Sequence, residues 1–185
     1  MIKKIQLPLT ENTIRELHAG DEVLLSGSVL TGRDAAHKRL ISLIEKGDAL
    51  PVSLRGEVIY YVGPAPARPG HAVGPAGPTS SYRMDRYTPP LLELGLKGMI
   101  GKGRLGEDTL AAMQEHGAVY FGAVGGSAVL IAKSIVSSEV VAYPDLGTEA
   151  IHRFVIRDFP AVVAVDARGH NLYEEGPKLY KQIEL

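Results

Sequence analysis

Short apolar runs alternate with helical segments along this chain, and this alternation is the strongest constraint on its fold. Runs rich in β-branched and aromatic residues indicate strands, whereas apolar residues spaced three and four apart indicate helices. Such a chain is typical of a mixed α/β domain. The expected strands cover 21–30, 56–64, 96–100, 118–124 and 151–159, and the expected helices cover 33–47, 87–95, 106–117 and 127–135.

Turn-forming residues mark where these elements begin and end. Thr88 is expected to cap the helix that follows it, because its hydroxyl can accept from a free backbone N–H. The stretch 161–173 predicts a β-hairpin about Asp166–Gly169. The Pro- and Gly-rich stretch 64–78 predicts a loop, either a surface linker or the frame of a site. We find no internal repeat and no break, so 1–185 is expected to form a single domain.

The composition excludes several classes of protein. The chain has 185 residues, a net charge of −1 and no cysteine. A near-neutral chain has no electrostatic bias toward nucleic acid or membranes. It contains neither an apolar run of about 18 residues nor the h-region of a signal peptide, so a cytoplasmic protein is expected. Without cysteine it cannot form a disulfide, use a thiolate nucleophile or ligate an iron–sulfur cluster through thiolates.

Two motif interpretations are disfavoured. GKGRLG at 101–106 fits GxGxxG, but residues 118–138 contain no Asp or Glu to bind a ribose, so dinucleotide binding is not expected. A P-loop would require glycine at Leu96 and a hydroxyl at Gly103. The six histidines show no HxxxH or HExxH spacing, so no metal site formed by this chain alone is expected.

Charged residues lie where the first expected strand ends and a helix begins, in TGRDAAH. Arg33 could be a solvated loop arginine or part of an anion site. Asp34 would favour the helix N-terminus electrostatically. His37 lies one turn into the helix, where it either packs and caps or supports Arg33 from behind, and packing is the favoured interpretation.

A second group of polar residues lies in GPTSSYRMD and GMIGKG. Thr79 and Ser80 follow Gly-Pro, where hydroxyls and backbone N–H groups can form an anion-binding nest or simply cap their own turn. Arg83 follows closely, and Asp85 could hold it by an ion pair. Lys102 stands between two glycines, where the backbone can approach a ligand closely. Together with Arg33, these residues suit a small dicarboxylate, because Arg binds carboxylates bidentately and Lys adds a mobile charge.

Five blocks of the chain carry a resemblance to a known family. TGRDAAH, GPTSSYRMD, YTPPLLELGLKGMIGKG, VGGSAVLIAKSI and DLGTEAI occur in this order. In this order they resemble the β subunit, or the C-terminal half of fused forms, of class I iron–sulfur fumarate hydratases and L-tartrate dehydratases. The resemblance extends from about residue 8 to residue 180. Ser80 replaces a threonine common in the family, and Tyr82 stands where a small residue is common.

The resemblance implies a swivelling β/β/α fold with a mixed sheet and flanking helices. It implies a partner α subunit that carries a [4Fe–4S] cluster on three cysteines, which agrees with the absence of cysteine here. By resemblance, Thr79 and Lys102 are the catalytic candidates, and Arg33, Thr79, Ser80, Arg83 and Lys102 contact substrate. Asp34, His37 and Asp85 would contact these residues, and not the substrate, and hold them in position. We expect a heteromeric assembly that is inactive without the α subunit.

Three functions remain open from the sequence. The first is a hydro-lyase β subunit that takes part in the reversible hydration of fumarate to malate, a reaction of the tricarboxylic acid cycle. The second is an L-tartrate dehydratase β subunit, whose reaction gives oxaloacetate. The third is a dicarboxylate- or nucleotide-sensing module that catalyses nothing. The first two substrates differ by one hydroxyl, and contacts that discriminate it can lie partly in the partner.

Overall fold

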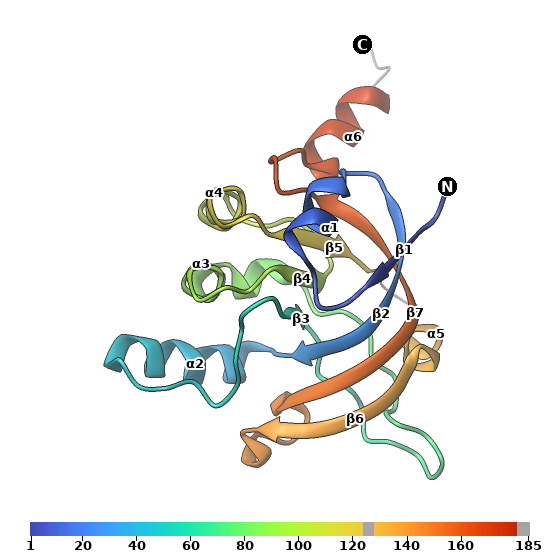
Figure 1. The fold of residues 1–185 in the computed structure, drawn as a ribbon. Helices are drawn as coiled ribbons and strands as arrows, with labels where there is room; N and C mark the ends of the chain where they lie inside the picture. Colours follow the sequence, from blue (N-terminus) through green and yellow to red (C-terminus); the bar gives the residue numbers. More distant parts are fainter. Residues whose placement is uncertain (124–127, 181–185) are drawn as a thin grey trace, which may run out of the picture.

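The computed structural model describes residues 1–123 and 128–180. Its seven strands form one sheet, in the spatial order β1-β2-β3-β4-β5-β7-β6 (Figure 1). The strands are β1 (Lys3–Gln6), β2 (Glu22–Thr31), β3 (Val58–Tyr60), β4 (Gly98–Gly101), β5 (Val119–Gly122), β6 (Ile135–Ala142) and β7 (Ile151–Val165).

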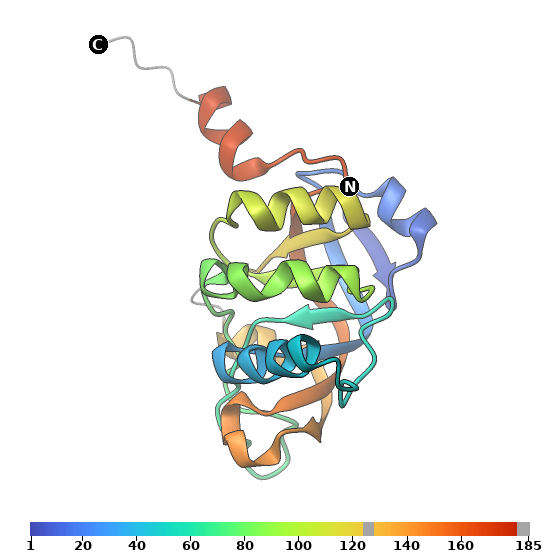
Figure 2. The same ribbon diagram turned by 90° about the vertical axis from the view of Figure 1, so that its left-hand side faces the viewer.

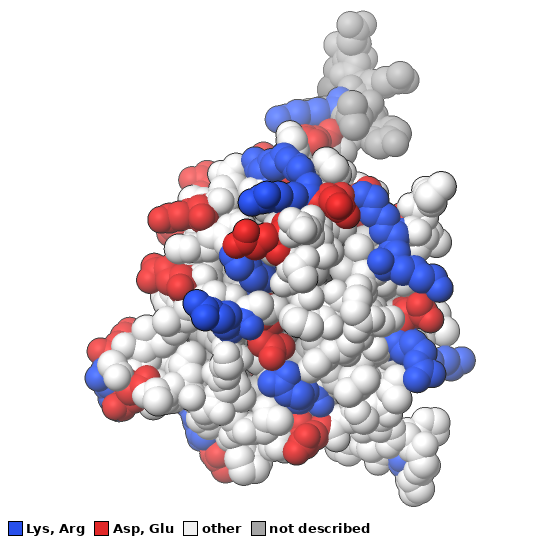
Figure 3. Space-filling view, viewed as in Figure 1, with Lys and Arg blue, Asp and Glu red and all other residues white. Residues whose placement is uncertain are grey.

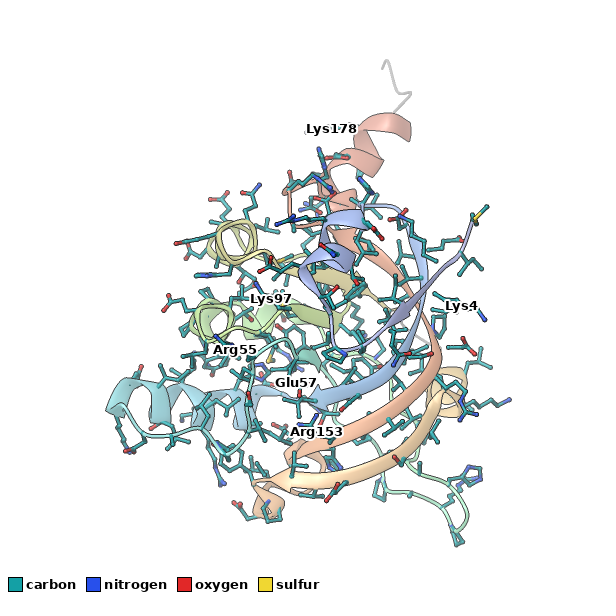
Figure 4. All side chains as sticks on the ribbon, in the orientation of Figure 1. Lys4, Arg55, Glu57, Lys97, Arg153 and Lys178 are labelled. Atoms are coloured by element: carbon teal, nitrogen blue, oxygen red, sulfur yellow. The ribbon has the colours of Figure 1, made fainter. Side chains whose placement is uncertain are left out.

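The sheet closes on itself to form a five-stranded barrel. Strand β7 is 15 residues long and pairs antiparallel with both β5 and β2, so β2, β3, β4, β5 and β7 form a ring. β1 adds to β2 in parallel, and β6 adds to β7 in antiparallel orientation. Arg153 on β7 points toward Glu57, the residue before β3, with Nη1 3.0 Å from Oε1 (Figure 4). The expected α/β fold with a mixed sheet is confirmed, and the strand patterns had not predicted its closure.

Three helices cover the outer side of the parallel strands. α2, α3 and α4 lie side by side across the front of the view in Figure 2. The helices are α1 (Glu11–Glu16), α2 (Asp34–Lys46), α3 (Thr88–Glu93), α4 (Glu107–His116), α5 (Ala128–Lys133) and α6 (Leu172–Tyr180), with 3₁₀ segments η1 (Ser81–Tyr87) and η2 (Pro144–Glu149).

The core has two layers because neighbouring strand residues point to opposite faces. Val58 and Tyr60 on β3 belong to the cluster of apolar side chains inside the barrel, together with Phe121 on β5. Ile59 and Tyr120 belong instead to the cluster that the helices cover. Short strands that are buried on both faces read as continuous apolar runs, as the sequence indicated.

The carboxyl ends of β2, β3 and β4 lie at one edge of the barrel. These strands run parallel in neighbouring positions. The ladder continues one residue past each strand. Gly32 N donates to Tyr60 O at 3.1 Å, and Tyr61 N donates to Ile100 O at 2.8 Å. The turns that follow the strands therefore lie next to one another, and we call this region the strand-end edge.

Several sequence expectations need correction. The hairpin predicted at 161–173 is wrong, because the chain turns after β7 and enters α6. Thr88 is the first residue of α3 and not its N-cap, since η1 leads directly into that helix and the Thr88 hydroxyl bonds to Met84 O. β1, α1 and β6 were not predicted. The expected start of helix 127–135 falls within 124–127, outside the described residues.

Acidic and basic side chains are interspersed on the face in Figure 3, with uncharged surface between them. This agrees with the net charge of −1. No described helix combines the length and the apolar character needed to cross a membrane.

Candidate functional site at the strand-end edge

Lys102 and Ser80 lie side by side at the end of β4. The two residues form an isolated parallel bridge, and Ser81 N donates to Lys102 O at 2.9 Å. The Lys102 side chain is exposed, whereas Ser80 is half-buried. Thr79 is also half-buried, and its N–H donates to Tyr61 O at 2.7 Å. Thr79, Ser80 and Lys102 therefore share the part of the edge formed by β3 and β4.

A glycine is required where β4 meets η1. A Cβ at Gly101 would lie 2.0 Å from Ser81 Oγ, which is far inside any van der Waals contact. The Ser81 hydroxyl is buried and lies 2.9 Å from the Tyr120 hydroxyl. This close packing holds the Thr79–Ser81 turn directly against the turn that carries Lys102.

Arg33 and Arg83 meet at one carboxylate. Arg33 directly follows β2 and the glycine after it, and Arg83 lies on η1. Asp34 Oδ2 is 3.9 Å from Arg33 Nε and 3.6 Å from Arg83 Nη2. All three side chains are partly exposed. The segment η1 thus begins beside Lys102, after β4, and its Arg83 side chain lies next to Asp34, after β2.

Glu149 is a further charged residue at this place that the sequence reasoning missed. Its Oε2 accepts from Ala35 N at 2.9 Å, at the start of α2, and its Oε1 lies 3.9 Å from Arg33 Nη2. A carboxylate at a helix N-terminus is favourable electrostatically. The only sequence signal was its position in the block DLGTEAI. Gly63 gives Arg33 room, since a Cβ there would lie 2.9 Å from Arg33 Cδ.

His37 lies directly behind Arg33. Its Nδ1 is 2.8 Å from Arg33 O, so Nδ1 carries the proton and donates. The ring is fully buried and packs against Tyr61 and Tyr87. Burial lowers the His37 pKa to about 4, although the bond to Arg33 O and the charge of Asp34 oppose the shift. His37 is therefore a neutral packing residue that also fixes the Arg33 carbonyl.

Asp85 does not pair with Arg83 in the part of the chain that the structure describes, contrary to the sequence expectation. Its Oδ2 accepts from Gly106 N at 2.9 Å, and its carbonyl accepts from the Thr109 hydroxyl. Burial raises the Asp85 pKa, and the Thr109 side chain and the Gly106 N–H next to the carboxyl group oppose the shift. Asp85 thus fastens η1 to the start of α4, and Asp34 takes the place next to Arg83.

The edge gathers cations and hydroxyls on an open surface. β2 and β4 are separated only by β3, so their ends lie about 10 Å apart. Long Arg and Lys side chains at such ends can reach a common small anion. A hollow of about 400 Å³ beside Arg68–Pro75 and α5 contains none of the predicted site residues. The described residues include no group of three or more His, Asp or Glu side chains that could hold a metal ion.

The comparisons with known proteins identify the family. The family model described as "Fumarase C-terminus" matches residues 1–176. A putative fumarate hydratase class I from Geobacillus stearothermophilus is 40% identical over 92% of this chain and 33% of its own length. The aerobic class I fumarate hydratase of Escherichia coli K12 is 39% identical over 82% of this chain and 28% of its own length. The chain thus spans about a third of these relatives.

A second kind of relative matches end to end. A putative L(+)-tartrate dehydratase subunit beta from Methanocaldococcus jannaschii is 32% identical over 95% of this chain and 93% of its own length. The resemblance found in the sequence is therefore confirmed by both fused and separate relatives. The chain belongs to the fumarase C-terminus family of hydro-lyase β-subunit-like domains.

Proposed function

We propose that this chain is the β subunit of a heteromeric [4Fe–4S]-dependent hydro-lyase that interconverts fumarate and malate. The observation that carries the proposal is the strand-end edge, where Arg33, Arg83 and Lys102 lie with Thr79 and Ser80. These residue types match the two carboxylates of such a substrate. Relatives named as class I fumarate hydratases at about 40% identity support the choice of reaction.

In this proposal the chain's cations stabilise charge that develops during dehydration. Removing a proton beside a carboxylate places negative charge on that carboxylate, and fixed cations lower the energy of this state. Arg33 and Arg83 orient the substrate through its carboxylates, and Lys102 supplies a further positive charge. Thr79 contacts the substrate, and its hydroxyl relays the proton that leaves the substrate carbon. A threonine hydroxyl is a very weak base, so a carboxylate or histidine of the partner must accept that proton onward.

The cluster belongs to the proposed partner. This chain has no cysteine, so it cannot supply the thiolate ligands that an iron–sulfur cluster requires. Held by the α subunit, the cluster would supply a Lewis acid for the substrate hydroxyl. The strand-end edge would then face that subunit and close the site from the other side.

L-Tartrate is the second candidate substrate. The end-to-end match with a protein named as a tartrate dehydratase β subunit favours it. Ser80 and Tyr82 also depart from the common family pattern, and Tyr82 is 67% exposed. One additional hydroxyl on the substrate can be accepted or rejected by a few polar contacts.

The test is anaerobic co-expression of this chain with a class I α subunit from the same genome. We expect the purified complex to convert malate and fumarate into each other, and the chain alone to be colourless and inactive. Activity on tartrate without activity on malate would select the second candidate. Binding of dicarboxylate with no turnover in the complex would contradict both enzymes and favour a sensing module.

A further inference from the structure

The turn that carries Lys102 is held by two tyrosine hydroxyls. Tyr120 donates its hydroxyl to Gly103 O at 3.0 Å, and Gly103 N donates to the Tyr173 hydroxyl at 3.1 Å. Tyr120 belongs to β5, whereas Tyr173 is the second residue of α6, 70 positions from Gly103 in sequence. Both polar groups of Gly103 are therefore bound by side chains from distant parts of the chain.

The backbone around Lys102 is also anchored on its other side. Ala123 N donates to Gly101 O at 2.8 Å, and Ser81 N donates to Lys102 O at 2.9 Å. The Lys102 side chain itself remains exposed. Gly103 is exposed, has φ +82°, and offers open space within 4 Å of the position that a Cβ would take. The hydrogen bonds of Gly103 to Tyr120 and Tyr173 therefore help to fix the direction in which the chain leaves Lys102.

We propose that Tyr173 is a positioning residue for Lys102, acting through the N–H of Gly103. The inference rests on the proposed function, in which Lys102 stabilises charge on the substrate. A preorganised cation is effective only while its position is held, and small displacements reduce catalysis strongly. A loop flanked by glycines has much freedom to move. The Tyr173 hydroxyl removes part of this freedom from outside the loop.

Tyr173 is the better residue to test because its hydroxyl, which also lies beside the Tyr120 hydroxyl, is not needed to anchor α6. Tyr173 N donates to Asn171 Oδ1 at 3.0 Å, and Glu174 N donates to Asn171 O. Arg104 Nη2 donates to the backbone carbonyl of Tyr173 at 3.1 Å. All of these bonds survive Tyr173→Phe. Tyr120 is a poorer probe, because its buried hydroxyl also bonds to Ser81.

The experiment compares Tyr173→Phe with wild type in the reconstituted complex. We expect kcat to fall about tenfold while KM stays within about twofold, because Lys102 acts mainly on the transition state. The matched control is Tyr143→Phe, which removes a buried hydroxyl that has no hydrogen-bond partner in the described part of the chain, on the residue directly before η2. Its kcat should equal that of wild type.

A double-mutant cycle separates positioning from general structure. In a Lys102→Ala background, Tyr173→Phe should cause no further loss of kcat. A full additional tenfold loss there would overturn the proposal, as would normal kcat in Tyr173→Phe itself. If Lys102→Ala is as active as wild type, the proposed role of Lys102 fails, and the positioning role fails with it.

A second measurement needs neither substrate nor partner. Amide hydrogen exchange in the chain alone should show loss of protection at Gly103 in Tyr173→Phe, with unchanged protection in α4 and α6. Exchange at Gly103 equal to wild type would show that the hydroxyl does not hold the turn and would overturn the inference. Loss of protection throughout α6 would indicate that Tyr173 anchors the helix, which contradicts it equally.

Discussion

At the scale of single residues, Asp34 determines how two guanidinium groups can lie close together. It is 3.9 Å from Arg33 Nε and 3.6 Å from Arg83 Nη2. Two guanidinium groups next to the same carboxylate repel each other, and the negative charge of the shared carboxylate offsets this repulsion. Glu149 adds a second carboxylate, with Oε1 3.9 Å from Arg33 Nη2. Of the five charged residues named here, with Lys102 included, three are cations and two are carboxylates, so together they carry one positive charge for an incoming anion.

The cations themselves give the first prediction. In the reconstituted complex, Arg83→Ala and Lys102→Ala should each reduce kcat/KM by roughly 10²-fold, the loss typical for one preorganised charge-stabilising group. Lys38→Ala, which removes an exposed lysine of α2, is the control and should change kcat/KM less than twofold. Steady-state kinetics on malate measures all three. Near-normal activity in both site variants would contradict the anion-site assignment.

His37 gives a prediction on pH and stability. Its folded pKa of about 4 is below the unfolded value of about 6.5, so the unfolded state binds more protons between these values. The free energy of unfolding should therefore keep its full contribution from the neutral His37 ring above about pH 6.5. It should fall by roughly 3 kcal/mol as the pH drops toward 4. Denaturant titrations from pH 4 to 7 measure this. His37→Gln should flatten the profile and His18→Gln should not; equal profiles in all three proteins would contradict burial of a neutral ring.

Part of this site could be predicted from residues and part could not. Arg33 and Lys102 were predictable because each follows a strand candidate, and parallel strands end at the same edge. Glu149 and Tyr173 were not, because their contacts lie 114 and 70 positions away in sequence. No local pattern reports such a pairing. Asp85 was assigned to Arg83 because it is near in sequence, whereas the 3₁₀ turn directs it toward α4.

At the scale of elements, the junction of β4 and η1 is the tightest packing at the edge. Gly101→Ala would place a methyl group 2.0 Å from Ser81 Oγ and 3.0 Å from Tyr61 Cδ2. Overpacking of this kind costs about 2 kcal/mol, and thermal unfolding should show a lower Tm. Gly176→Ala is the control, because a Cβ there meets nothing within 4 Å. Adding Ser81→Ala should recover part of the loss. An unchanged Tm in Gly101→Ala would contradict the packing.

The elements were predictable where they carried their own signals. α2 and α4 both end at a glycine in the left-handed region, and the sequence placed both correctly. β6 was missed because its burial does not alternate, and it lies at an open edge of the sheet. The hairpin was predicted from Asp166–Gly169, which does turn the chain. A helix follows this turn, whereas the prediction had a second strand. Only tertiary packing decides between a strand and a helix at this place.

At the scale of the whole molecule, the strand-end edge of β2, β3 and β4 is connected to an exposed apolar helix through the loop that precedes Thr79. The helix α5 follows β5 in the chain, and Ala128 O accepts from Ala76 N in the loop that leads to Thr79. Val129 and Leu130 on this helix are 63% and 66% exposed. Exposed apolar side chains grouped near a site indicate a surface that another protein covers. We expect the α subunit to cover them.

Leu130→Asp should therefore prevent assembly without unfolding the chain. A carboxylate at the centre of an apolar interface loses its hydration and finds no prepared partner, which costs several kcal/mol of binding free energy. The chain alone should keep its Tm within a few degrees, because Leu130 is exposed. Val140→Asp on β6 is the matched control, since Val140 is 46% exposed on a different element. Co-purification with the tagged α subunit should be lost in Leu130→Asp and retained in Val140→Asp. Retention in both would place the α subunit on another face, and loss only in Val140→Asp would place it on the β6 edge.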